Sequence, residues 1–422
     1  MKSTLSGFLL MLAIGCSTQG SEPRALSQVE TTHHPGDVIV LPDGTYKDQN
    51  LHLTGVGTAD HRITFLAQTP GKVVFTGNSV ITLDGQYLVL SGIMLKNGGA
   101  GSSTKGKGEP DDGIAVKGAH NRLTDCAVSG GTYKFLVHLY GADIHMDHCY
   151  LAGKTSGEPT LQIEAPGEPN NDHIEYNHFG HRRPLGRNGG ETMRVGYSWQ
   201  SMNNSRSLVE HNLFDRCDGE IEIISSKSCE NTYRYNTFLD CGGMLTLRHG
   251  NRCVVDSNFF IAHHKKGSGG IRVIGEDHVI VNNYIEGVEQ GGFWITSGLE
   301  HPPLKTYFAA RNCVIAFNTF VDSAGPAVDL DAGFGSSNRT VMPQDITIAN
   351  NILSPDQNGA VLKGKAGPGY AILGNLSAKD ASESNITGIR AADLGLQRGS
   401  DGLWRPTANP TSAVTRLDRP WR

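Results

Sequence analysis

The chain has 422 residues, of which 53 are glycine, and a formal net charge of -5. Charged residues make up only 19% of the chain and aromatic residues 7%. This balance is not basic enough for a nucleic-acid partner to be expected, and not charged and apolar-poor enough for a disordered chain. The glycines follow no three-residue period, which excludes collagen. Glycine at this level, mixed with Asn, Val and Ile, predicts many short strands joined by tight turns.

The N-terminus has the features of an export signal. Lys2 precedes the apolar run 7–14, which is too short to anchor a helix in a bilayer, and the run ends at Gly15-Cys16. A small residue before a cysteine at this distance resembles a bacterial lipoprotein signal, and an ordinary secretory signal is the alternative. We expect a signal peptide over residues 1–15, lipidation of Cys16 and a tether over residues 16–27. The protein would then be exported in a bacterium, as an outer-membrane lipoprotein or a periplasmic or secreted protein. It would touch the membrane only through this lipid anchor.

One short block, of the form polar-x-Asn-x-apolar, recurs along most of the chain. Its spacings are 35, 24, 22, 25, 35 and 33 residues, so the common unit is about 22 to 25 residues and three units carry inserted loops. The asparagines of the block are Asn177, Asn212, Asn236, Asn258, Asn283, Asn318 and Asn351. Asparagine suits this position because it tolerates left-handed backbone and because its amide can bond to the same residue of the next unit. Two earlier units have Cys126 and His148 in this position.

The segment after each block begins with glycine and then alternates apolar and polar residues, which is typical of a strand with one buried face. Units of this length with several short strands stack as a parallel β-helix. We therefore predict an all-β fold, a single right-handed parallel β-helix over residues 28–380. A short helix near residues 25–33 would cap its first coil. The periodicity fades beyond it, so residues 381–422 are expected to form a cap or tail.

Seven cysteines follow Cys16, and some of them share the spacing of the repeat. Cys217 and Cys241 are 24 residues apart, as are Cys229 and Cys253. None has the spacing of a metal site. Because the spacing coincides with one coil, we expect stacked thiols in the interior, with disulfide bonds as the alternative.

If the coils stack, equivalent positions form columns along the solenoid. One outward column would be mostly charged or aromatic; it contains Arg194, Glu222, Thr246, Arg272 and Trp294. Ile221 and Ile223 would then point inward. Aligned charges and a tryptophan suggest a groove for an extended polymer, and a solvated surface is the alternative.

The coil at residues 219–228 places several reactive groups together. Glu220 and Glu222 lie two residues apart on one face of a strand, about 7 Å from each other, and carboxylates this close favour a shared cation. An oxygen-liking cation such as Ca²⁺ suits them, with an amide oxygen from Asn188 in the preceding coil. Lys227 follows at the end of the strand, and Arg248 lies 21 residues further, slightly under one coil.

The order of these residues resembles polysaccharide lyase family 6, which includes alginate lyases and the dermatan-cleaving chondroitinase B. The matching features are the segment R-N-G-G-E-T-M-R around Asn188, the E-x-E-x4-K run ending at Lys227, and the gap from Lys227 to Arg248. The resemblance covers essentially the whole mature chain and implies a parallel β-helix. It implies that Asn188, Glu220 and Glu222 bind Ca²⁺, with Lys227 as general base and Arg248 as general acid.

The expected reaction is β-elimination in a 4-linked uronate polymer, most of all alginate. A cation on the uronate carboxylate makes the C5 proton easier to remove. Arg248 would donate the proton to the leaving oxygen or stabilise its charge. The candidates for holding flanking sugars are Arg194, His249, Arg272 and Trp294, because arginine pairs with carboxylates and tryptophan stacks on sugar rings.

Three other functions compete with an alginate lyase. A dermatan or chondroitin sulfate lyase uses the same chemistry but would call for more basic residues. A galacturonan hydrolase needs a cluster of aspartates on adjacent coils, and the chain has only the adjacent pair Asp111-Asp112. A non-catalytic, surface-tethered glycan-binding solenoid would bind the polymer without turning it over.

Overall fold

The computed structural model describes residues 26, 29, 32–99, 112–379 and 387–407. The expected signal peptide, the lipidation site Cys16 and nearly all of the expected tether lie outside these residues, as does Asp111. Of the expected N-terminal helix only Leu26, Val29 and the residues from 32 onward are described, and Val29 is buried against the first coils. Among the described residues, no helix has both the length and the apolar character needed to cross a membrane.

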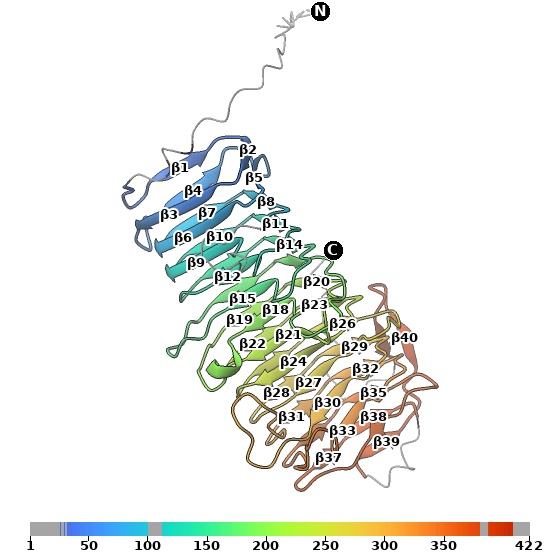
Figure 1. Ribbon diagram of the computed structural model, residues 1–422. Helices are drawn as coiled ribbons and strands as arrows, with labels where there is room; N and C mark the ends of the chain where they lie inside the picture. The colour runs from blue at the N-terminus through green and yellow to red at the C-terminus, as the bar shows by residue number, and fades with distance from the viewer. Residues whose placement is uncertain (1–25, 27–28, 30–31, 100–111, 380–386, 408–422) are drawn as a thin grey trace, which may run out of the picture.

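The chain winds into a right-handed parallel β-helix, as predicted. Successive strands join three long sheets in turn, and each strand pairs in parallel with its equivalent in the coils before and after it. Figure 1 shows these coils stacked in chain order, from the blue first coils to the orange and red last ones. One coil therefore places its residues directly beside those of the next coil.

Each sheet takes every third strand along most of the chain. The first sheet contains β1 (Val38–Leu41), β4 (Ile63–Ala67), β7 (Leu88–Ser91), β10 (Arg122–Thr124), β13 (His145–Asp147), β16 (His173–Glu175), β19 (Leu208–Glu210), β22 (Thr232–Arg234), β25 (Val254–Asp256), β28 (Val279–Val281), β31 (Val314–Ala316), β34 (Thr347–Ala349) and β37 (Ala371–Leu373). The second contains β2 (Gly44–Lys47), β5 (Val73–Thr76), β8 (Met94–Lys96), β11 (Ala127–Ser129), β14 (Tyr150–Ala152), β17 (His178–Phe179), β20 (Leu213–Asp215), β23 (Thr237–Leu239), β26 (Phe259–Ile261), β29 (Tyr284–Glu286), β32 (Thr319–Val321), β35 (Ile352–Ser354), β38 (Asn375–Ser377) and β39 (Ile389–Ala391). The third contains β3 (Asn50–Val56), β6 (Val80–Gln86), β9 (Ile114–Ala119), β12 (Val137–Leu139), β15 (Leu161–Ile163), β18 (Met193–Val195), β21 (Glu222–Lys227), β24 (Met244–His249), β27 (Ile271–Val273), β30 (Phe293–Thr296), β33 (Val328–Ala332) and β36 (Leu362–Lys363). The 3-10 turn η2 (Ser198–Gln200) follows β18.

The repeated asparagines form a buried ladder between the first and second sheets. Each amide nitrogen donates to the side-chain oxygen of the next asparagine, at 3.0 Å from Asn236 to Asn258 and 3.0 Å from Asn258 to Asn283. The predicted ladder is confirmed, and it extends to Asn375. The left-handed residue is not the asparagine but the one before it, such as Tyr235 with φ 55°. The asparagine is therefore required for its side-chain amide and not for a left-handed backbone conformation.

The earlier coils use cysteine in the ladder position. Cys126 lies there as predicted, but Cys149 rather than His148 follows it, because the Cys149 backbone amide donates to the Asn177 side chain at 2.9 Å. His148 takes the left-handed position before it, with φ 51°.

Removing one rung of the ladder should destabilise the solenoid. In Asn258→Ala, the Asn236 backbone amide loses its partner inside the core, and the Asn236 side-chain amide and the Tyr233 carbonyl each lose one hydrogen bond. Buried polar groups without partners cost about 1–3 kcal/mol each, so we expect a loss of about 3 kcal/mol in unfolding free energy by chemical denaturation. Asn358→Ala, at an exposed turn, is the matched control and should change it by less than about 0.5 kcal/mol. Equal values for the two variants would contradict the role of the ladder.

The described cysteines are stacked thiols, as expected, rather than disulfides. All seven of them are buried and free. They act as weak hydrogen-bond partners between coils: the Cys217 backbone amide lies 3.3 Å from the Cys241 sulfur, and the Asn251 amide lies 3.2 Å from the Cys229 sulfur.

The C-terminal segment folds back along the outside of the second sheet. The antiparallel pair β40 (Leu396–Arg398) and β41 (Trp404–Pro406) lies beside this sheet, and Leu394 and Leu403 are buried in a second apolar cluster with residues of β26, β29, β32 and β35. Figure 1 shows β40 next to β29 and β35, beside the solenoid. The described part of the expected cap or tail thus adds β39 to the end of the second sheet and then covers that sheet from the side.

Candidate active site

Strand β21 of the third sheet departs from regular alternation. Its pairing with β24 shifts register between Glu222 and Ile224 and again between Ser226 and Lys227. As a result Ser225, not Glu222, pairs with Arg194 in the outward column. The predicted place of Glu222 in that column is therefore wrong, and Ile221 is 36% exposed rather than pointing inward. The bulge is the local feature that lets Glu222 and Lys227 of this strand face the same site as Glu220, which precedes the strand.

The site is built around three carboxylates from two coils. Glu191, which precedes β18, approaches Glu220 and Glu222, and one oxygen from each lies within 4.8 Å of the others. We call these three residues the carboxylate triad. The sequence reasoning missed Glu191, although it belongs to the same R-N-G-G-E-T-M-R segment as Asn188.

Four cationic side chains surround the carboxylate triad. Two of them approach Glu191 Oε1: Lys227 Nζ at 3.5 Å and Arg194 Nη1 at 3.7 Å. Two approach Glu222 Oε1: Arg248 Nε at 3.5 Å and Arg272 Nη1 at 3.7 Å. Arg194 is also paired with Glu158 at 2.9 Å, so four cationic side chains face four carboxylates and the formal charges of the site balance. The cations of an overall acidic protein are thus concentrated at this site.

The surrounding cations do not neutralise the negative charge of the carboxylate triad at Glu220. Burial, together with the charges of Glu191 and Glu222, raises the pKa of Glu220 to about 8. Two triad oxygens, Glu191 Oε2 and Glu220 Oε1, are buried without a hydrogen-bond partner. Carboxylate oxygens with free lone pairs are the ligands that Ca²⁺ prefers. The residues present therefore fit a calcium ion.

Glu220 should make stability depend on pH and on divalent cations. Its folded pKa of about 8 lies above the ordinary value of 4.5, so the folded state binds more protons between these values and loses stability as pH rises through them. In chelator, we expect Glu220→Gln to be more stable than the natural protein near pH 8, by about 1–2 kcal/mol after allowance for solvent screening. Near pH 4.5 the difference should vanish. Chemical denaturation at both pH values measures it, and a difference independent of pH would contradict this origin.

Asn188 lies on an exposed loop beside the carboxylate triad. It lines a hollow with Lys134, Glu158 and Arg187. The backbone amide of the next residue, Gly189, favours the charged form of Glu220 and so opposes the rise in its pKa. The role of Asn188 as a metal ligand stays a prediction. Glu191, in contrast, places a carboxylate oxygen within 4.8 Å of oxygens of the two predicted glutamates.

The predicted sugar-binding residues lie along the same face. The column runs Arg194, Ser225, Thr246, Arg272 and Trp294 through consecutive strands of the third sheet. Arg194 is only 7% exposed, because it donates to Gln162 at 2.6 Å and to Glu158 at 2.9 Å. Arg272 has a buried Nε without a hydrogen-bond partner, which leaves a donor for a ligand.

His249 lies beside the predicted base, because it pairs with Lys227 between β24 and β21. Burial and the nearby charges of Arg248 and Lys227 lower the pKa of His249 to about 3. It is therefore a neutral imidazole at any pH near neutrality, and its Nδ1 has no hydrogen-bond partner.

Tyr307, from the segment between β30 and β31, closes one side of the site and was not predicted. Three guanidinium carbons lie over its ring: Arg248 at 4.3 Å, Arg339 at 4.8 Å and Arg272 at 5.5 Å. Burial raises the pKa of Tyr307, but the charges of Arg248 and Arg272 outweigh burial and lower it. No spacing in the sequence links residue 307 to residue 248, because the inserted segment belongs to no repeat.

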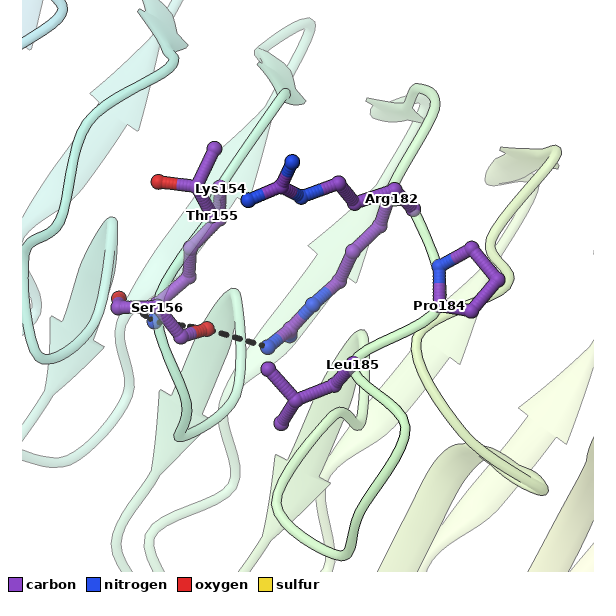
Figure 2. A pocket seen from close by; sticks show the side chains of 7 residues that line it. Lys154, Thr155, Ser156, Arg182, Pro184 and Leu185 are labelled. Carbon is purple, nitrogen blue, oxygen red and sulfur yellow. Dashed lines mark hydrogen bonds between the residues drawn. The ribbon is translucent and has the colours of Figure 1, made fainter.

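Two buried cations lie behind the carboxylate triad. Figure 2 shows Lys154 and Arg182 from neighbouring coils, on the two sides of one pocket. Arg182 donates to the backbone oxygens of Glu191 and, at 2.7 Å, Glu158, while Lys154 donates to the Ser156 hydroxyl at 2.5 Å. Burial lowers the pKa of Arg182 to about 10, and burial and Arg182 lower that of Lys154 to about 7. Arg182 thus holds the backbone that carries Glu191, and Lys154 holds the neighbouring loop at Ser156 and Gly157.

Comparison with known proteins shows to which protein family the chain belongs. The solved structures that share this fold over most of the chain include lyases of polysaccharide lyase family 6. The family model described as Chondroitinase B matches residues 21–415. The chain therefore belongs to the Chondroitinase B family and is a member of polysaccharide lyase family 6, as its motifs imply. A search of curated proteins gives no match.

Three solved structures illustrate the similarity. The family 6 alginate lyase AlyGC is 34% identical with a TM-score of 0.83, and the match covers 92% of this chain and 54% of AlyGC. The chain thus spans about half the length of AlyGC. A mannuronic acid specific family 6 lyase from human gut microbiota is 33% identical with a TM-score of 0.77, covering 86% of this chain and 87% of that one. Pedsa3628 from Pseudopedobacter saltans, 24% identical with a TM-score of 0.76 and covering 87% and 94%, agrees in fold.

Proposed function

We propose that the protein is a lyase that cleaves 4-linked uronate polymers by β-elimination, and that its substrate is alginate. The observation that carries the proposal is the convergence of Lys227 and Arg248 on the carboxylate triad. Two solved structures more than 30% identical to this chain are described as an alginate lyase and a mannuronic acid specific lyase, which supports the choice of polymer.

Lys227 is the proposed base. A neutral lysine amine takes the proton from C5 of the uronate, the C4–O4 bond breaks, and a C4–C5 double bond forms. The leaving oxygen carries the negative charge and takes up a proton. Lys227 is partly exposed at the end of β21, so its amine is open to the groove.

Arg248 and its neighbours hold the acidic sugar. Arginine stays protonated in proteins, so Arg248 stabilises the charge on the leaving oxygen or passes on a proton from solvent. Arg272 pairs with a second uronate carboxylate, and Trp294 in the next coil offers a ring face to a sugar.

Glu191, Glu220 and Glu222, with Asn188 beside them, would hold a calcium ion. The bound ion would neutralise the uronate carboxylate and so ease removal of the C5 proton. Arg182 keeps the backbone of Glu191 in place for this role.

A dermatan or chondroitin sulfate lyase is the second candidate, because the matching family model is described as Chondroitinase B. Purified protein mixed with alginate, polymannuronate, polyguluronate and dermatan sulfate separates the candidates. The unsaturated product absorbs ultraviolet light, and we expect absorbance to rise with alginate. A rise with dermatan sulfate alone would select the second candidate. Binding of alginate without any rise would make the protein a glycan-binding solenoid.

A further inference from the structure

A second cluster of metal-binding side chains lies on the outer face of the first sheet, away from the carboxylate triad in the third sheet. His145 of β13 and His173 of β16 are direct partners in neighbouring coils, and Glu175 follows His173 by two residues. One ligand atom from each of these three residues lies within 4.8 Å of the others.

Both imidazoles bring Nε2 close to the Glu175 carboxylate. His145 Nε2 lies 2.9 Å from Glu175 Oε1, whereas His173 Nε2 lies 3.5 Å from Glu175 Oε2 and hydrogen-bonds to Glu210 Oε1 at 2.9 Å. The two rings are stacked nearly parallel, with centroids 5.0 Å apart and an angle of 8° between their planes. To share one ion with His145 and Glu175, His173 Nε2 would release Glu210 Oε1 and turn toward the other two ligand atoms.

The charges along this face single out Glu175. Its neighbours in the same column are Asp147 of β13 and Glu210 of β19. Asp147 accepts two hydrogen bonds from Arg122, at 2.8 and 2.7 Å, and Glu210 accepts one from Arg234 at 2.5 Å. Among the described residues no arginine forms an ion pair with Glu175; its close partners are the two imidazoles, and the charge of Arg122 acts on it from further away. Glu175 is therefore the carboxylate of this row without a hydrogen-bonded arginine.

We propose that His145, His173 and Glu175 form a zinc site. Imidazole nitrogen and carboxylate oxygen are ligands typical of Zn²⁺, and two histidines with one glutamate leave a fourth position for water. All three side chains are partly exposed, which gives the ion and its water access from solvent. The ion would link strands β13 and β16 and so join two coils. Calcium, which prefers oxygen ligands, would not compete for this site.

Isothermal titration calorimetry of the untagged protein with Zn²⁺, in a large excess of Ca²⁺, tests the proposal. We expect one zinc ion to bind per chain. His173→Ala and the more conservative Glu175→Gln should each weaken zinc binding by at least about tenfold. His61→Ala, at an exposed turn of an early coil, should leave it unchanged. Circular dichroism shows whether each variant is folded.

A spectroscopic readout separates direct coordination from an indirect effect. Co²⁺ bound by two histidines and a carboxylate gives visible absorption bands, which should be present in the natural protein and lost in His173→Ala. Zinc binding that persists in both folded variants, or no zinc binding by the natural protein, would overturn the proposal. Lyase activity enters neither measurement, so the outcome is independent of the proposed function.

Discussion

Lys227→Ala is expected to lower the rate of alginate cleavage by about 100- to 10,000-fold, the range that a positioned general base contributes. The alanine cannot accept the C5 proton, while Arg248, Arg272 and the carboxylate triad keep their positions. Binding of the polymer should therefore change much less than turnover. Initial rates of ultraviolet absorbance, measured together with alginate affinity, give both quantities.

Lys72→Ala is the matched control for this variant, because Lys72 is exposed at a turn of an early coil. It should keep the full rate. A Lys227→Ala protein that is folded and as fast as the control would show that another group removes the proton. A variant that loses binding and turnover equally would make Lys227 a binding residue.

Calcium binding should depend on Glu191, the residue of the carboxylate triad that the sequence reasoning missed. Glu191→Gln removes one negative charge and a buried oxygen that has no partner in the structure. Because the number of charged ligands sets calcium affinity, we expect calcium binding at least about tenfold weaker. Activity in chelator should be lost and should return at a higher calcium concentration than the natural protein needs.

Glu168→Gln, in an exposed loop, controls for the loss of charge alone and should leave calcium affinity unchanged. Full activity of the natural protein in chelator would contradict a role for calcium. In that case the guanidinium groups near the carboxylate triad would be the groups that neutralise the substrate.

The repeat predicted the fold because the contacts that stabilise each coil join equivalent residues of adjacent coils. The asparagine block recurs at the coil period, and the amide ladder from Asn177 to Asn375 shows why the residue type repeats. The same period put Lys227 and Arg248 at the ends of adjacent strands, which is where they lie. A stacked solenoid turns a spacing in sequence into a neighbour in space.

The sequence did not predict the positions of residues correctly where a coil departs from the regular repeat. Strict alternation placed Glu222 in the outward column, but the bulge in β21 gives that position to Ser225. A bulge adds a residue without a signature in the apolar pattern. Tyr307 comes from an inserted segment whose path depends on tertiary contacts, such as the hydrogen bond from Arg248 Nη1 to the Thr306 oxygen at 3.4 Å. Neither feature follows from periodicity.

The central claim is that this site cleaves alginate by elimination, without adding water. Mass spectrometry of the products formed in water enriched in ¹⁸O tests it directly. Elimination predicts unsaturated oligosaccharides in which the broken linkage carries no ¹⁸O, since the leaving oxygen comes from the polymer. Saturated products that gained one ¹⁸O at each cut would show hydrolysis and contradict the account.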